Sequence, residues 1–207
     1  MGRQGAVAVD IVYETHATTT DNEAGLATGW QPGRLSEHGR RGARQLGERR
    51  RADGLAAVFC SDLARAVETV EIAFPARELP VHRDTRLREC DYGELTGHPV
   101  AELAARRLRH LDEPFPGGQS YRQVVEQTRA FLRDLAAAWD GRRVLVVAHS
   151  ANRWALDHLL REVPLADLLG APFEWRPGWS YRLPTRWGAD RPAPARLQPG
   201  QPAPEHR

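Results

Sequence analysis

Two histidines follow apolar segments of this chain, each where a buried strand would end. His16 comes shortly after residues 6–13, and His149 directly follows residues 144–148. In an open α/β sheet, reacting groups collect at the carboxyl ends of parallel strands. Two imidazoles delivered to that edge predict a shared site, and a neutral imidazole is a good nucleophile toward phosphorus. The spacing therefore indicates phosphoryl chemistry.

Two further side chains would complete such a site. Arg65 lies in the first turn of the helix expected after a second buried strand, where a guanidinium and backbone N–H groups both favour an anion. Glu89 lies in a charged loop, and one carboxylic acid there can protonate a leaving oxygen and later accept a proton from water. We expect His16 to attack phosphorus while Arg65 and His149 hold the phosphoryl oxygens.

Strand-like and helix-like segments alternate along the chain. The expected strands are residues 6–13, 55–60, 79–83, 144–148 and an edge strand at 176–183. The expected helices are residues 36–51 with Ser36 as N-cap, 63–74 with Asp62 as N-cap, 100–111, 120–139 and 151–160. This order predicts an α/β three-layer sandwich, in which a mostly parallel central sheet carries helices on both faces.

Length and composition narrow the class of protein. The 207 residues, 41% of them hydrophobic, predict a single domain over residues 1–187, followed by a Pro-rich disordered tail at 188–207. Every basic residue is arginine, yet the net charge is only +2 and the charges are interspersed, which disfavours a nucleic-acid binder. No apolar stretch approaches the ~20 residues of a membrane span, and no signal-peptide core is seen, so we expect a cytoplasmic protein without membrane contact.

Several other features predict no special chemistry. Cys60 and Cys90 lack the spacing of a metal pair and are too few for a disulfide scaffold. The histidines and carboxylates also lack metal-ligand spacing, so neither a metal nor an organic cofactor is expected. Trp175 and Trp179 are interpreted as packing or interface residues. The sequence leaves open whether two copies of the chain form a homodimer through an edge strand.

Taken in order, these motifs resemble those of the histidine phosphatase superfamily, which includes the cofactor-dependent phosphoglycerate mutases. The resemblance extends roughly over residues 9–160. No single segment decides it, and the order of the segments makes it specific. The segments are residues 28–30, 35–39, 61–65, 87–93, 116–120 and 146–149.

The resemblance implies roles for the residues that match. His16 matches the phosphorylated nucleophile, Arg65 the phosphate-binding arginine, Glu89 the proton donor and His149 the second histidine of the phosphate pocket.

A second set of residues is expected to bind substrate. Asn22 matches a polar pocket residue of mutase-like members, and Thr28 and Gly29 match a loop that touches substrate in those members. Thr15 and Ser150 are expected at the pocket because they adjoin the two histidines.

The opening motif departs from the family pattern. The superfamily begins with arginine-histidine-glycine, whereas Thr15 and Ala17 flank the histidine here. Loss of one such donor group costs about 2–4 kcal/mol of transition-state stabilisation, which is on the order of a hundredfold or more in rate. Glu14 adds a negative charge beside this gap, and Arg88 or Arg153 are the candidates to compensate for it.

The sequence therefore predicts a phosphoric-monoester hydrolase that acts on a small phosphorylated metabolite through a phosphohistidine. The short segment between Glu89 and Gly117 favours hydrolysis over mutase activity, because mutases of this kind carry a longer insertion there. One alternative is a non-catalytic anion-binding or regulatory protein on the same scaffold. Another is an enzyme of specialised metabolism with a rebuilt pocket.

Overall fold

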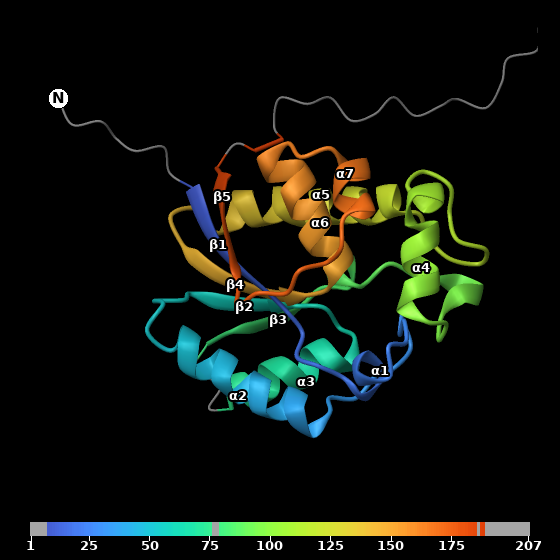
Figure 1. Ribbon diagram of the computed structural model, residues 1–207. Helices are drawn as coiled ribbons and strands as arrows, with labels where there is room; N and C mark the ends of the chain where they lie inside the picture. Colours follow the sequence, from blue (N-terminus) through green and yellow to red (C-terminus); the bar gives the residue numbers. More distant parts are fainter. Residues whose placement is uncertain (1–7, 76–78, 186, 189–207) are drawn as a thin grey trace, which may run out of the picture.

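The computed structural model describes residues 8–75, 79–185 and 187–188. Its centre is a five-stranded sheet in the order β3-β2-β4-β1-β5 (Figure 1). The strands are β1 (Ala8–Thr15), β2 (Ala57–Cys60), β3 (Val81–Arg83), β4 (Arg143–Ala148) and β5 (Trp179–Pro184). The pairs β1–β4, β2–β4 and β2–β3 are parallel, and β5 pairs antiparallel with β1. The mostly parallel sheet with an added edge strand is therefore confirmed.

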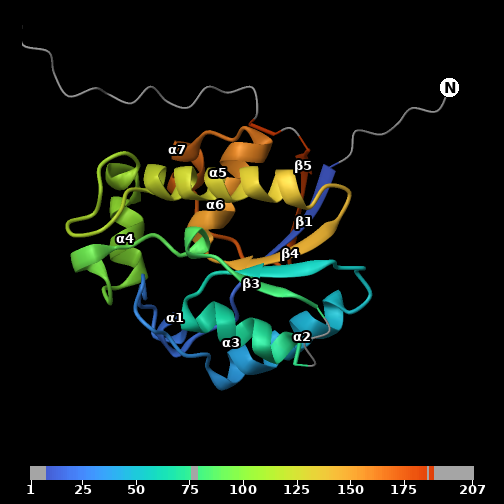
Figure 2. The same cartoon turned by 180° about the vertical axis from the view of Figure 1, so that it is seen from behind.

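Helices cover both faces of this sheet, as the two opposite views show (Figures 1 and 2). The helices of the lower layer in Figure 1 are α2 (Glu37–Arg50) and α3 (Ala64–Ala73), and those of the upper layer are α5 (Tyr121–Ala138) and α6 (Ser150–Arg161). Shorter helices are α1 (Thr20–Glu23), α4 (Val100–Arg106) and α7 (Leu165–Gly170), and single 3-10 turns span Thr85–Leu87, Gly93–Leu95 and Arg107–His110. This is the predicted three-layer α/β architecture.

Alternation along β1 divides the core between the two layers. Val12 belongs to the cluster that contains Leu46 of α2 and Val70 of α3. Ile11 belongs to the opposite cluster, with Leu132 of α5. Successive side chains of a strand point to opposite faces, so a buried central strand must be apolar on both. The residues that end β1 are therefore held between two packed layers.

Helix starts show where local sequence signals hold and where one fails. Ser36 caps α2 as predicted, since its Oγ accepts a hydrogen bond of 3.1 Å from the backbone N–H of Gly39. Asp62 was expected to cap the next helix, and this is wrong: α3 begins after Leu63 without a side-chain cap. The Asp62 carboxylate instead accepts hydrogen bonds from Arg88, at 2.7 Å from Nε and 2.5 Å from Nη2.

The expected helix over residues 100–111 is also divided, because α4 ends at Arg106 and a 3-10 turn follows. The other predicted boundaries lie within three residues of those observed. Of the predicted tail, residues 189–207 lie outside the described residues. Among the described residues, no helix is long and apolar enough to cross a membrane.

A close approach between α2 and the segment after β1 fixes the position of His16. A Cβ atom at Gly39 would overlap the carbonyl oxygen of Thr18. That same oxygen accepts a hydrogen bond of 3.0 Å from the backbone N–H of Ser36. Glycine at this position is therefore required so that α2 can lie against the chain two residues beyond His16.

Two glycines of α2 provide a matched test of this contact. Gly39→Ala should lower the free energy of unfolding by at least about 2 kcal/mol, because the added methyl group meets backbone that cannot move freely. Gly42→Ala has open space around its Cβ and should raise stability by roughly 0.5–1 kcal/mol through helix propensity. Denaturant unfolding of both variants checks this. Equal stability of the two would contradict the packing account.

Candidate active site

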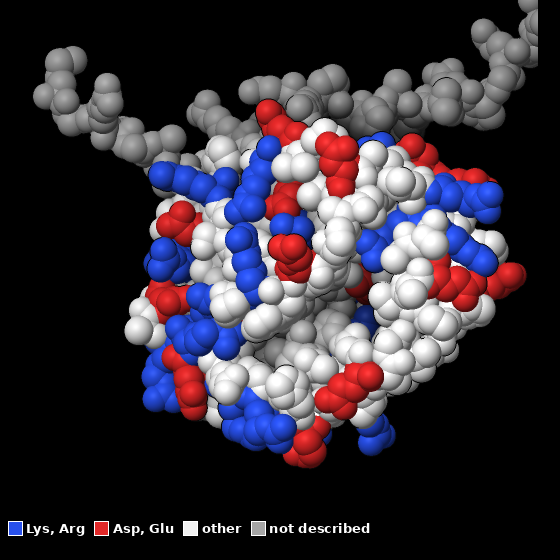
Figure 3. Space-filling view, in the orientation of Figure 1, with Lys and Arg blue, Asp and Glu red and all other residues white. Residues whose placement is uncertain are grey.

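A cavity of about 680 Å³ opens where β1 and β4 end. Figure 3 shows this face hollowed near its centre, between the upper layer and α2. Eight of the predicted site residues line the cavity: Thr15, His16, Asn22, Thr28, Gly29, Arg65, Glu89 and Ser150. The exception is His149, which is wholly buried behind the wall. Its ring centroid lies 5.1 Å from that of His16, so the two imidazoles do meet.

Arg65 joins the two imidazoles. It is 2% exposed, and its Nε donates to His16 Nε2 at 3.2 Å while its Nη2 lies 3.4 Å from His149 Nδ1. Its remaining hydrogen bonds go to the carbonyl oxygens of Gly29 at 2.8 Å and Gln31 at 3.2 Å. All these acceptors are neutral, and no carboxylate of the described residues forms an ion pair with Arg65. A buried cation with only neutral partners attracts an anion.

The partners of His16 define its tautomer. A guanidinium can only donate, so His16 Nε2 must accept and therefore carries the lone pair. The other nitrogen, Nδ1, lies 2.8 Å from the carbonyl oxygen of Ala17 and donates to it. Burial, and then the positive charge of Arg65, lower the pKa of His16 to about 3. His16 is thus a neutral imidazole near neutral pH, with its nucleophilic nitrogen on the side of Arg65.

His149 is held in a similar way. It is the N-cap residue of α6, and its backbone carbonyl accepts a hydrogen bond from the Tyr13 hydroxyl. Burial, followed by the charge of Arg65 and the neighbouring His16, lowers the pKa of His149 well below its ordinary value. Its Nε2 is buried and has no hydrogen-bond partner among the described residues. This ring therefore retains one buried polar atom for a group that enters the site.

Glu89 is fixed by hydrogen bonds from three donors. Its Oε1 accepts from the backbone N–H groups of Cys90 at 2.8 Å and Ala151 at 3.3 Å. Its Oε2 accepts from the Ser150 hydroxyl at 2.9 Å. The backbone carbonyl of Glu89 in turn accepts from Trp30 Nε1 at 2.6 Å. The carboxyl group is therefore held at the cavity wall, between the start of α6 and the loop that also binds Arg65.

The remaining predicted binding residues have structural contacts as well. The Thr28 hydroxyl donates to the Asp21 carboxylate at 3.0 Å. The Asn22 side-chain oxygen accepts from the backbone N–H of Thr19 at 3.0 Å and so forms part of the capping box of α1. Both residues also line the cavity. No group of three His, Cys, Asp or Glu side chains in the described ranges could hold a metal ion.

Comparison with known proteins agrees with this geometry. The model of the histidine phosphatase superfamily (branch 1) matches residues 15–174. The chain belongs to this superfamily. A 2,3-bisphosphoglycerate-dependent phosphoglycerate mutase of Methylobacterium sp. (strain 4-46) is 34% identical over 189 residues, which cover 80% of this chain and 90% of that protein.

Solved structures show the same fold. Bacillus stearothermophilus YhfR matches with a TM-score of 0.72 and 28% identity, over 82% of this chain and 88% of that chain. A mycobacterial glucosyl-3-phosphoglycerate phosphatase, solved as a complex with VO3, matches with a TM-score of 0.69 and 28% identity, over 79% and 87% of the two chains. The resemblance inferred from the motifs and the α/β fold class are both confirmed.

Neither arginine suggested as a substitute for the missing guanidinium lines the cavity. Arg88 pairs with Asp62, and its guanidinium lies over the Trp30 ring. Arg153 pairs with Asp157 at 2.7 Å, and its guanidinium lies over the ring of Trp179. Both guanidinium groups therefore form ion pairs and ring contacts outside the cavity. The proposal that either one compensates for Thr15 is therefore wrong.

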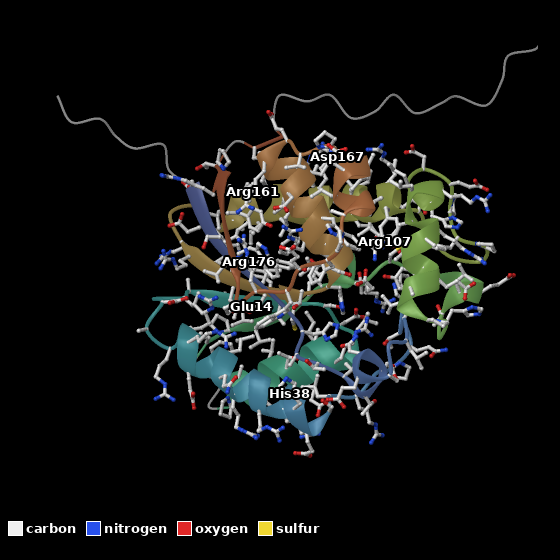
Figure 4. All side chains as sticks on the ribbon, in the orientation of Figure 1. Glu14, His38, Arg107, Arg161, Asp167 and Arg176 are labelled. Carbon is white, nitrogen blue, oxygen red and sulfur yellow. The ribbon has the colours of Figure 1, made fainter. Side chains whose placement is uncertain are left out.

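The negative charge of Glu14 is balanced by two arginines of α2. Glu14 is 1% exposed and forms ion pairs with Arg50 at 2.7 Å and Arg49 at 3.4 Å. Its charge is therefore already balanced beside the nucleophile. Figure 4 shows Glu14 near the centre of this face, between α2 and the upper layer.

Sequence reasoning missed much of the cavity wall. Arg41, Arg49 and Arg107 line it, as do aromatic side chains of α6 and of the segment before β5. His38, Arg41, Gln45 and Arg49 recur at helical spacing, and this signal could have revealed one shared face of α2. Trp175 lines the cavity and is 61% exposed, so it does not pack in the core, and the alternative expectation of an interface residue stays a prediction. Trp179 is buried in the core, as expected.

The buried imidazole predicts a pH dependence of stability. The pKa of His149 is lowered in the folded protein, so the unfolded chain binds more protons below the ordinary value of 6.5. The free energy of unfolding should therefore decrease as pH falls below 6.5. The decrease should be about 1.4 kcal/mol per pH unit over the range in which His149 is protonated in the unfolded chain but not in the folded protein. Denaturant unfolding between pH 7.5 and pH 5 should show a steeper decrease in the free energy of unfolding for the wild type than for His149→Asn.

The NMR signals of the His149 ring provide the control, and they should keep their neutral-form positions over this range. Titration of these signals near pH 6.5 in the folded protein would contradict the account.

Proposed function

We propose that this protein hydrolyses a small phosphoric monoester through a phosphohistidine at His16. The observation that supports this most directly is the buried Arg65 guanidinium, whose acceptors are two imidazoles and two carbonyls. A phosphoryl group entering the cavity would supply the missing negative charge. The same guanidinium would then stabilise the charge on the equatorial oxygens during transfer.

The reaction divides between His16 and Glu89. When substrate binds, Arg65 Nε turns from His16 to a phosphoryl oxygen and frees the Nε2 lone pair. This lone pair attacks phosphorus as the bond to the ester oxygen breaks, and Glu89 donates a proton to the leaving alcohol. Water then attacks the phosphohistidine, Glu89 takes a proton from that water, and the N–P bond breaks to release phosphate. The Nδ1–H bond to the Ala17 carbonyl holds the ring in one orientation throughout.

His149 has a supporting role in this proposal. It does not reach the cavity wall, so it acts through Arg65, whose Nη2 it faces. Thr15, Asn22, Thr28, Gly29 and Ser150 would surround the substrate.

Hydrolysis is favoured over mutase activity by the short segment between Glu89 and Gly117, which leaves water access to the intermediate. The solved structures similar to this chain include a phosphatase, whereas its sequence relatives include mutases. The missing guanidinium at Thr15 favours the second candidate, an anion-binding protein without turnover. A cytoplasmic location, no nucleic-acid or membrane partner and a homodimer remain predictions.

Rapid-quench detection of acid-labile phosphohistidine separates hydrolysis from simple binding. A panel of phosphate esters should yield inorganic phosphate with the wild type, and labelled phosphate should be trapped on the protein. His16→Ala should abolish both, because it removes the only attacking atom in the mechanism. Turnover by His16→Ala would exclude this residue as nucleophile, and phosphate binding without a trapped intermediate would support the non-catalytic alternative.

Thr15→Arg restores the guanidinium that the superfamily motif contains. Because Thr15 lines the cavity and Glu14 is already paired with Arg50, the new side chain is free to reach the phosphoryl site. We expect kcat/KM for simple phosphate esters to rise by on the order of tenfold to a hundredfold. Thr15→Gln, which adds length without charge, is the control. A flat or lower kcat/KM for Thr15→Arg would show that the pocket has been rebuilt for another purpose.

A further inference from the structure

The cavity is far larger than a phosphoryl group requires, and much of its remaining wall is apolar. This wall comes from α4, α6 and the segment between α7 and β5. We call it the aromatic wall, and it consists of Val100, Leu103, Trp154, Phe173 and Trp175. Binding sites commonly combine such apolar surface with a few polar groups that fix orientation.

The rings of the aromatic wall are held by edge contacts. The centroids of Trp154 and Phe173 lie 6.0 Å apart at an interplanar angle of 82°. Tyr121 meets Trp154 from its other side at 5.8 Å. Aromatic pairs in this range prefer such edge-to-face geometry. Trp154 and Phe173 are thus held in place by neighbouring rings.

Trp175 is the most exposed member of the wall, and a chain of contacts secures its segment. Arg50 donates to the carbonyl oxygen of Pro177 at 3.2 Å while its Nη2 also lies 2.7 Å from Glu14. A Cβ atom at Gly178 would overlap the Arg50 guanidinium, so this segment passes directly against it. Glu14, next to Thr15 in β1, therefore holds the Trp175 segment in place through Arg50.

Two arginines near this wall have different partners, a carboxylate for Arg49 and backbone carbonyls for Arg107. Arg107 lies with its guanidinium carbon 4.9 Å from the Trp154 ring centroid, and its Nη1 donates to the carbonyls of Leu169 and Ala171, each at 3.4 Å. Figure 4 shows Arg107 near α4, away from Glu14. Arg49 is paired with Glu14. An aromatic ring on the substrate would add to the ring contacts of this wall and leave the hydrogen bonds of Arg107 in place.

We propose that the substrate is a phosphate monoester whose alcohol carries an aromatic ring, which packs on the aromatic wall while His16 and Arg65 engage the phosphoryl group. This rests on the proposed function for the phosphoryl end of the site. It assigns Trp154, Phe173 and Trp175 to specificity, and it makes Glu14 a positioning residue.

The test compares 2-phenylethyl phosphate with ethyl phosphate, because both are esters of simple primary alcohols and differ mainly in the ring. The wild type should favour the phenylethyl ester in kcat/KM by at least about tenfold, as expected for burial of a phenyl group. Trp175→Ala should lower this ratio toward one, and Trp175→Phe should restore much of it. Leu108→Ala, which alters an exposed apolar side chain outside the cavity, should keep the wild-type ratio.

Glu14→Gln tests the positioning role, since it weakens the hold on Arg50 without touching the wall. It should lower the same ratio, whereas a purely structural role would reduce turnover of both esters equally.

Binding of 2-phenylethylphosphonate, which cannot be hydrolysed, separates this proposal from the proposed function. Calorimetry should show tighter binding than for ethylphosphonate, with the difference lost in Trp175→Ala. If the phosphonates show this pattern while no ester is hydrolysed, the hydrolase assignment fails. The proposal that the site binds a phosphate group with an attached aromatic ring then stands. Equal kcat/KM for the two esters, equal binding of the two phosphonates, or a preference for a substrate with a second phosphate would overturn the inference.

Discussion

The charge of Arg65 is the constraint around which the site is arranged. Removing a guanidinium from water costs several kcal/mol, and neutral acceptors offset this only in part. Two loop carbonyls and two imidazoles surround it, and none of them supplies a negative charge. The folded protein therefore keeps a positive site that an anion can complete. The neutral state of both histidines follows from their burial, which lowers the pKa of each ring, and then from the same charge.

The same constraint explains why distant loops are interlocked. The loop that gives its Gly29 carbonyl to Arg65 also contains Trp30, whose indole N–H binds the Glu89 carbonyl. Arg88, next to Glu89, lies over that indole and pairs with Asp62 just before α3, which presents Arg65. A continuous set of contacts therefore connects the carboxyl group to the guanidinium.

The sequence predicted the elements that depend on local pattern. The strand-helix alternation, the Ser36 cap and the meeting of two imidazoles could be inferred because each depends on nearby residues or on a general rule of parallel sheets. The prediction that Asp62 caps α3 was wrong because Arg88, 26 positions away, binds its carboxylate instead. Glu14 could not be explained for the same reason, since Arg50 is 36 positions away.

The cavity wall was the least predictable part. Trp154 and Trp175 come from different segments, and neither has a short motif around it. Their shared surface depends on how α6 packs and on how Arg50 secures the segment before β5. Such contacts have no periodic signal in the chain. The depth of His149 was also missed, because its place at a strand end says nothing about which atoms cover it.

Titration with orthovanadate tests the central claim most directly, because this anion has the charge and shape of a transferring phosphoryl group. Calorimetry on the wild type should give one site per chain, and Arg65→Gln should weaken binding by at least about tenfold, as for loss of a charged hydrogen-bond partner. Circular dichroism of the variant would confirm that it is folded. Unchanged vanadate affinity in folded Arg65→Gln, or no binding to the wild type, would contradict the account.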